Sequence, residues 1–186
     1  MRQQITGAPI VGRSLAYGEG NNMISKKVCM LGAFAVGKTA LVQQYVHSIF
    51  TDRYLSTVGV KISKKVVQYG EQQISIVLWD LEGKDDYADV HISYLRGAMG
   101  FFVVADGTRR ETLDIALSLR ILALDLIGPV PHALLVNKAD LAPSWEITDD
   151  QIHALEQMGM SVIKTSAKTG LAVNESFMSL AGAMLG

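Results

Sequence analysis

Short apolar runs alternate with amphipathic segments along most of this chain, and this alternation limits the possible folds more than any other feature. The first run, Lys26 to Gly32, closes on glycine, as expected of a buried strand that feeds a tight turn. The patterns predict strands at 26–32, 58–68, 73–79, 100–105, 132–136 and 161–164, and helices at 39–48, 111–126, 148–158 and 173–185. Such alternation is typical of a mostly parallel sheet with helices on both faces.

One connection departs from this alternation. The segments 58–68 and 73–79, both rich in Val and Ile, are separated only by Tyr69-Gly70-Glu71-Gln72. A link of this kind between two strands predicts an antiparallel hairpin. We therefore expect an α/β fold with a six-stranded sheet, mostly parallel with one antiparallel strand. In such sheets ligands bind at the carboxyl ends of the strands.

The chain has 186 residues, a length that suits a single domain. Residues 1–22 contain four glycines and scattered polar residues without a period. We therefore expect a flexible arm over 1–25 and one compact domain over 26–186. Hydrophobic residues make up 49% of the chain, which excludes an intrinsically disordered protein.

Charge and cysteine content exclude several classes of partner. A formal net charge of -1 leaves no basic field that could hold nucleic acid. Cys29 is the single cysteine, so no internal disulfide can form, and a reducing, cytoplasmic setting is expected. The sequence contains no apolar run of about 18 residues, no secretory signal and no lipidation motif, so we expect no membrane span, and no lipid anchor is evident. No feature indicates an oligomeric state.

The segment from Gly32 to Thr39 reads Gly-Ala-Phe-Ala-Val-Gly-Lys-Thr and matches the pattern G-x-x-x-x-G-K-[ST] of a phosphate-binding loop. It lies between a predicted strand and a predicted helix, which is the context that this loop requires. Its glycines let the backbone wrap closely around phosphate, whose oxygens the N–H groups of the loop and of the helix N-terminus bind. Lys38 supplies a positive charge, and Thr39 offers a hydroxyl to Mg²⁺.

Two further loops follow predicted strands at the same edge of the sheet. Asn137-Lys138-Ala139-Asp140 comes after the strand at 132–136, and Ser166-Ala167-Lys168 comes after the strand at 161–164. Both lie where the base of a bound nucleotide is expected.

Together with the phosphate loop and with Asp80-Leu81-Glu82-Gly83, these loops resemble the G boxes of the Ras-like small GTPase superfamily. The resemblance covers about Lys26 to Leu185 and implies a P-loop G domain. The segment Tyr54 to Val60 and the pair Trp79-Asp80 make the chain most similar to the Rab branch.

The resemblance implies that the base is guanine, since Asp140 would accept hydrogen bonds from the N1–H and the exocyclic amine, a donor pair that adenine lacks. Asn137 would brace the loop and the base, Lys138 would cover one ring face and Phe50 the other. The Ala167 N–H would reach the guanine oxygen. An unpaired buried carboxylate against the wrong base costs a few kcal/mol, so GTP and GDP should exclude ATP.

The resemblance also implies a nucleotide-dependent switch that hydrolyses GTP. Thr57 would join Mg²⁺ when the γ-phosphate is present, Asp80 would hold the ion through water, and the Gly83 N–H would meet the γ-phosphate. Effectors and regulators should therefore engage segments 50–60 and 83–95, which report the nucleotide state. The metal set is Thr39, Thr57 and Asp80, and the catalytic set is Lys38, Thr57, Gly83 and Lys84. The nucleotide-binding set is Gly32, Ala35, Val36, Gly37, Lys38, Thr39, Ala40, Phe50, Gly83, Asn137, Lys138, Asp140, Ser166, Ala167 and Lys168.

Three positions depart from the family pattern. Lys84 stands where a glutamine normally orients the attacking water, Glu82 places a carboxylate beside the phosphate, and Phe34 would crowd an arginine finger from a partner. Lysine cannot both accept from water and donate to the phosphoryl group as an amide can, so we expect slow hydrolysis. Two alternatives stay open. Either Glu82 or His91 replaces the glutamine, or the protein is a scaffold that retains nucleotide without exchange or hydrolysis.

Overall fold

A six-stranded sheet forms the centre of the molecule, with strand order β2-β3-β1-β4-β5-β6. The computed structural model describes residues 23–51, 59–81 and 92–186. Only β2 runs antiparallel to its neighbour, β3, and the other four pairings are parallel. The strands are β1 (Ile24–Gly32), β2 (Val60–Tyr69), β3 (Gln72–Leu81), β4 (Gly100–Asp106), β5 (His132–Asn137) and β6 (Val162–Lys164). This confirms the fold class predicted from the alternating pattern.

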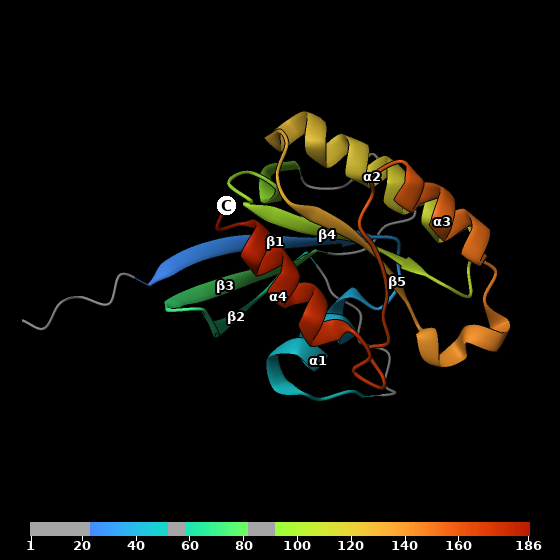
Figure 1. Ribbon diagram of the computed structural model, residues 1–186, viewed down its shortest axis with the longest axis horizontal. Helices are drawn as coiled ribbons and strands as arrows, with labels where there is room; N and C mark the ends of the chain where they lie inside the picture. The colour runs from blue at the N-terminus through green and yellow to red at the C-terminus, as the bar shows by residue number, and fades with distance from the viewer. Residues whose placement is uncertain (1–22, 52–58, 82–91) are drawn as a thin grey trace, which may run out of the picture.

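Helices cover both faces of the sheet, because successive residues of each strand point to opposite sides. In β1, Val28 and Met30 join one apolar core, while Cys29 and Leu31 join the other. The first core is closed by α1 (Lys38–His47) and α4 (Val173–Ala183), and the second by α2 (Glu111–Ile127) and α3 (Asp149–Gln157). Figure 1 shows α2 and α3 on one side of the sheet and α1 and α4 on the other.

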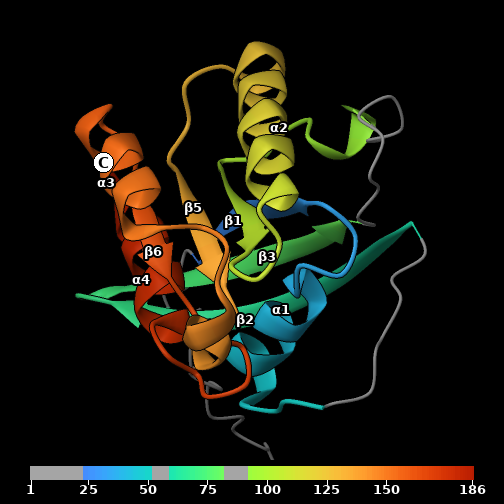
Figure 2. The same ribbon diagram turned by 90° about the vertical axis from the view of Figure 1, so that its right-hand side faces the viewer.

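The order of the strands creates a switch point beside β1. The chain leaves β1 through α1 and builds the β2–β3 hairpin on one side, and it then adds β4, β5 and β6 on the other. Figure 2 shows α1 against the β2 and β3 half of the sheet and α3 beside β6. The crevice outside the carboxyl ends of β1 and β4 is where sheets of this topology bind ligands.

Several boundaries differ from the expected ones. β1 begins at Ile24, so the last two residues of the expected arm are already strand, while residues 1–22 lie outside the described residues. The hairpin turn is tighter than expected, because Tyr69 pairs directly with Gln72 and Gly70 takes a positive φ of 58°. Two short 3-10 helices were not predicted, η2 (Ile92–Tyr94) and η3 (Ala139–Ser144). Within the described ranges, no helix is both long and apolar enough to cross a membrane.

Phe177 of α4 fixes how the two helices of the first core meet the sheet. Its ring stacks on Tyr45 of α1 with centroids 4.0 Å apart, and it meets Phe102 of β4 edge-on at 4.9 Å. All three residues are buried. A single ring therefore contacts α1, α4 and the sheet.

We expect Phe177→Ala to lower the free energy of unfolding by about 3–5 kcal/mol, because it leaves a cavity that its neighbours cannot fill. Urea denaturation of both proteins measures the difference. The control is Ile121→Ala on the exposed face of α2, where 57% of the side chain is accessible and the change should stay below about 0.5 kcal/mol. A loss under about 1 kcal/mol for Phe177→Ala would contradict this account of the core.

Candidate functional site

The loop between β1 and α1 lies against two other strands, and its two glycines make this possible. A Cβ at Gly32 would collide with the backbone carbonyl oxygen of Val104 in β4, and one at Gly37 would collide with Nδ2 of Asn137 in β5. Both glycines also have positive φ, 146° and 99°. The expected phosphate loop is therefore packed too closely for side chains at these two positions.

Lys38, at the start of α1, lies across this loop. Its side chain is buried, and Nζ donates to the carbonyl oxygens of Gly32 and Ala33 at 2.9 Å each. Gly37 precedes it as the N-cap residue and supplies no capping side chain. The first N–H groups of α1 thus face the loop together with a buried ammonium, an arrangement suited to an anion.

Thr39 and Asp80 bring a hydroxyl and a carboxylate together beside the loop. Thr39 Oγ1 donates to Asp80 Oδ2 at 2.6 Å, and Asp80 lies buried at the end of β3. Oxygen ligands of this kind, few in number, fit Mg²⁺, which keeps several of its waters in proteins. No group of three or more His, Cys, Asp and Glu side chains among the described residues could hold a metal ion. The donor set therefore suits Mg²⁺ better than a metal that needs a dense ligand cluster.

Asn137 joins three loops through its buried side-chain amide. Its Nδ2 donates to Val36 O in the phosphate loop at 2.9 Å. Its Oδ1 accepts from the Ala167 N–H at 3.1 Å and lies 3.4 Å from Thr165 Oγ1. The loops after β1, β5 and β6 are thereby held at one edge of the sheet, as their positions in the sequence predicted.

Asp140, in the loop after β5, is the other residue expected to meet the base, and it lies at the surface of the three joined loops. Buried Ser166 donates its hydroxyl to Asp140 Oδ1 at 2.6 Å, while Ser166 Oγ accepts from the Thr169 N–H at 3.1 Å. Asp140 itself is exposed, so its carboxylate is oriented by the protein and still accessible to a ligand.

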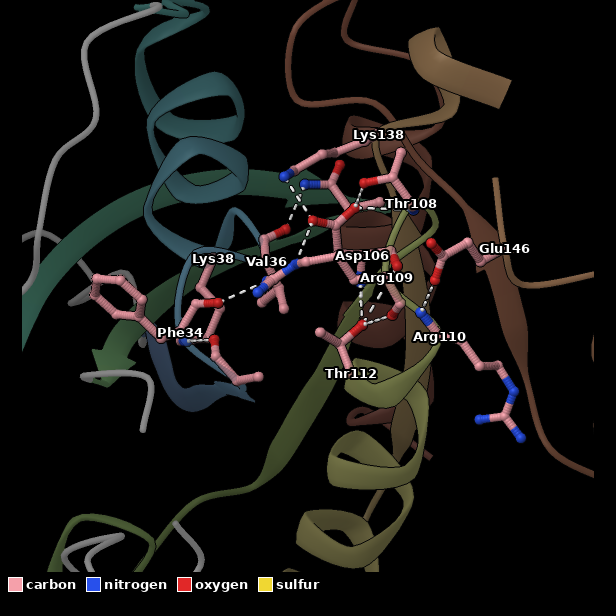
Figure 3. A network of polar contacts seen from close by, with 12 residues as sticks. Phe34, Val36, Lys38, Asp106, Thr108, Arg109, Arg110, Thr112, Lys138 and Glu146 are labelled. Atoms are coloured by element: carbon pink, nitrogen blue, oxygen red, sulfur yellow. Dashed lines mark hydrogen bonds and ion pairs between the residues drawn. The ribbon is translucent and has the colours of Figure 1, made fainter. Parts of the chain in front are cut away.

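Asp106, the last residue of β4, is a centre of this site that the sequence motifs did not indicate. Its carboxylate is buried and accepts from Lys138 Nζ at 2.6 Å, from Arg109 Nε at 3.0 Å, and from the N–H and hydroxyl of Thr108 at 3.0 and 2.8 Å. Figure 3 shows these groups converging on Asp106. Burial by itself raises the pKa of this carboxyl, but the bonds from Lys138 and Thr108 together outweigh it and hold the pKa below its ordinary value.

Arg109 extends this network to the phosphate loop, where Nη2 donates to Phe34 O at 2.7 Å. On the other side, Trp145 Nε1 donates to Lys138 O at 2.9 Å, and its ring packs over Gly107. The one available signal for these residues was a polar segment, Asp106 to Arg110, directly after the apolar run at 100–105.

The remaining expected residues fall into three groups. Phe50 and Lys168 are exposed, and Ala40 is half-buried in the first turn of α1. The Ala167 N–H, expected to reach a base, donates instead to Asn137. Thr57, Gly83 and Lys84, together with Glu82 and His91, lie outside the described residues.

The comparisons with known proteins place this chain among Ras-related proteins. The model of the Ras family matches residues 27–186. The chain is 33% identical to Ras-related protein Rab-7L1 of Rattus norvegicus over 167 residues, which cover 86% of this chain and 81% of that protein. It is 30% identical to Ras-related protein Rab-1 of Theileria parva over 161 residues, 85% of this chain and 73% of that protein. It is 29% identical to Ras-related protein Rab-13 of Mesocricetus auratus over 157 residues, which cover 83% of this chain and 77% of that protein.

We expect Asp106→Asn to lower the free energy of unfolding at pH 7 by about 3 kcal/mol, since it weakens a buried ion pair. Because the folded pKa of Asp106 is lowered, this contribution is complete above its unfolded pKa, near 3.8. It is lost as the pH falls through the folded pKa, so the wild-type advantage should shrink below about pH 4. Urea denaturation between pH 7 and 3 measures the difference. The control is Asp125→Asn at an exposed position of α2, whose effect on the free energy of unfolding should stay near zero. A stability difference between the wild type and Asp106→Asn that does not change with pH over this range would contradict the lowered pKa of Asp106.

Proposed function

Because this chain belongs to the Ras family, we propose that it is a guanine-nucleotide switch that binds GTP and GDP with Mg²⁺ and hydrolyses GTP slowly. Family membership and the similarity to Rab proteins support the general activity of a GTP-binding switch and GTPase. The residue roles and the metal are carried over from the family onto the matching positions of this chain, and the slow rate is inferred from its departure at Lys84. The observation that carries the proposal is the Asn137 amide, which binds the phosphate loop through Val36 O and the loop after β6 through the Ala167 N–H.

The phosphates would lie in the loop between β1 and α1. The backbone N–H groups from Ala35 to Ala40, where the loop passes into α1, would bind their oxygens. The Lys38 ammonium would supply positive charge, and it is already oriented by two carbonyl oxygens of the loop. Gly32 and Gly37 let the backbone come this close.

The base would be read by Asp140, whose carboxylate the Ser166 hydroxyl orients. It would accept from the N1–H and the exocyclic amine of guanine, and Phe50 and the Lys138 stem would cover the ring faces. The Lys138 ammonium is bound to Asp106, so the stem is fixed at both ends. The Ala167 N–H, which here donates to Asn137, would turn to the guanine oxygen when the base binds.

Thr39 and Asp80 would hold Mg²⁺ with Thr57, and the ion when bound neutralises charge on the phosphate oxygens. Thr57 would join Mg²⁺, and the Gly83 N–H would contact the γ-phosphate, in the GTP state alone. A contact present in one state only supplies the differential binding energy that a switch needs. Effectors and regulators would therefore bind segments 50–60 and 83–95.

Hydrolysis would be slow because Lys84 replaces the usual glutamine. The ammonium can donate hydrogen bonds but cannot accept one from the attacking water. Glu82 or His91 would be the residue that compensates if hydrolysis proved ordinary. Phe34, 41% exposed on the phosphate loop, would stand in the path of an arginine finger from a partner.

Loading with equal GTP and ATP in the presence of Mg²⁺ should leave guanine nucleotide alone on the protein, identified by ion-exchange chromatography after denaturation. We expect Asp140→Asn to weaken GDP binding at least about a hundredfold, because the amide presents a donor toward the guanine amine. It should improve xanthine nucleotide binding, since the amide can donate to the xanthine 2-oxygen while accepting from N1–H. The matched control is Asp150→Asn at an exposed position of α3. Unchanged guanine preference in Asp140→Asn would contradict the base assignment, and loss of all nucleotide from the wild type would refute the proposed function.

In single-turnover experiments, Lys84→Gln should raise the rate of GTP hydrolysis about tenfold or more, because an amide can position the water. Lys64→Gln, an exposed position on β2, tests whether any loss of lysine charge has this effect. If Lys84→Gln changes nothing while Glu82→Ala or His91→Ala abolishes turnover, one of those residues is the catalytic group. Identical proteolysis patterns with GDP and with a non-hydrolysable GTP analogue would show a scaffold instead of a switch.

A further inference from the structure

We propose that Arg109 is a positioning residue for the phosphate loop, which holds the peptide between Phe34 and Ala35 so that the Ala35 N–H points at bound phosphate. The inference rests on the proposed nucleotide binding and adds to it a residue outside every sequence motif. Its basis is the contact between the Arg109 guanidinium and the Phe34 carbonyl, joined to the backbone conformation of Ala35.

Arg109 is held in place along its whole length. Its backbone N–H donates to Asp106 O at 3.0 Å, and its carbonyl accepts from the N–H and the hydroxyl of Thr112 at 3.1 and 2.7 Å. Its Nε donates to Asp106 Oδ2 at 3.0 Å. The guanidinium is therefore oriented before any ligand arrives, and Figure 3 shows it extended from Asp106 toward Phe34.

The free end of this side chain binds the phosphate loop. Arg109 Nη2 donates to Phe34 O at 2.7 Å, across a sequence separation of 75 residues. In a planar trans peptide the carbonyl and the following N–H point in opposite directions. By holding the Phe34 carbonyl on its own side, Arg109 directs the Ala35 N–H to the opposite side, where the proposal places the phosphates.

Ala35 needs this support because its φ is +62°, a left-handed conformation that residues with a Cβ avoid. Rotating the Phe34–Ala35 peptide by half a turn would bring φ to about −118°, which is comfortable for alanine. That rotation would also turn the Phe34 carbonyl oxygen toward the phosphates and remove one of their donors. The Arg109 bond opposes the rotation, whereas a glycine at position 35 would have little reason to rotate.

The adjacent arginine provides a matched control. Arg110 has the same charge and is the N-cap residue of α2, but its guanidinium pairs with Asp114 at 2.9 Å on an exposed face. Removing the Arg109 side chain still leaves Asp106 bound to Lys138 and Thr108, so the fold should persist.

The test is the rate at which fluorescent GDP leaves the 186-residue chain in the presence of Mg²⁺. Arg109→Gln should raise this rate about tenfold, the size expected for one hydrogen bond to a charged group. Arg109→Lys should raise it nearly as much, because a lysine keeps the charge but cannot bind Asp106 and Phe34 with a planar fork. Arg110→Gln should change it less than about twofold. Combined with Ala35→Gly, the effect of Arg109→Gln should fall below about threefold.

An equal effect of Arg109→Gln with and without Ala35→Gly would overturn the inference, and so would full recovery by Arg109→Lys. If the wild type binds GDP and Arg109→Gln releases it at the same rate, this inference alone fails. A wild type that binds no guanine nucleotide overturns both the proposed function and the inference. Circular dichroism of each variant confirms that the comparison is between folded proteins.

Discussion

The side-chain amide of Asn137 is the interaction on which the rest of the site depends. It is buried, and both its polar atoms are used, Nδ2 on the phosphate loop and Oδ1 on the loop after β6. Because a buried amide left without partners costs free energy, the two loops and β5 have one favourable arrangement. Gly37 makes this possible, since the space beside it is filled by the amide itself. The proposed phosphate loop and the proposed base loop after β6, more than 100 residues apart in the chain, thus meet at one edge of the sheet.

Asp106 also links the phosphate loop and the base loop, through ion pairs. Its buried carboxylate is shared between Lys138 from the base loop and Arg109, which reaches the phosphate loop. Two cations around one carboxylate leave an excess of positive charge beside the phosphate loop, to which Lys38 adds another. Since these groups are fixed by the folded chain, an anion finds its partners already oriented, and little ordering is needed on binding.

The sequence predicted the strands, the helices and the phosphate loop because their signals are local: apolar periodicity, glycine positions and the strand-loop-helix context. Asp106 and Arg109 were missed for a physical reason. Asp106 meets Lys138 only because β4 lies beside β5, and Arg109 meets Phe34 only because β4 also lies beside β1. The positive φ of Ala35 was equally hidden, since alanine gives no signal for it. η3 was not predicted, because turn residues such as Asp140 and Pro143 favour a loop and also form short 3-10 helices.

The phosphate and base loops are held together by contacts among the described residues. Those contacts come from β1, α1, β4, β5 and the loops that follow β4, β5 and β6, while Glu82 and Lys84 lie outside the described residues. On the function proposed above, substitutions at positions 82 and 84 would change the fate of the γ-phosphate while these contacts stay in place. On that proposal the bound GTP state would be long-lived, and the third departure, Phe34, lies in the phosphate loop itself. The duration of that state would then be set by partners acting on segments 50–60 and 83–95 more than by the chain itself.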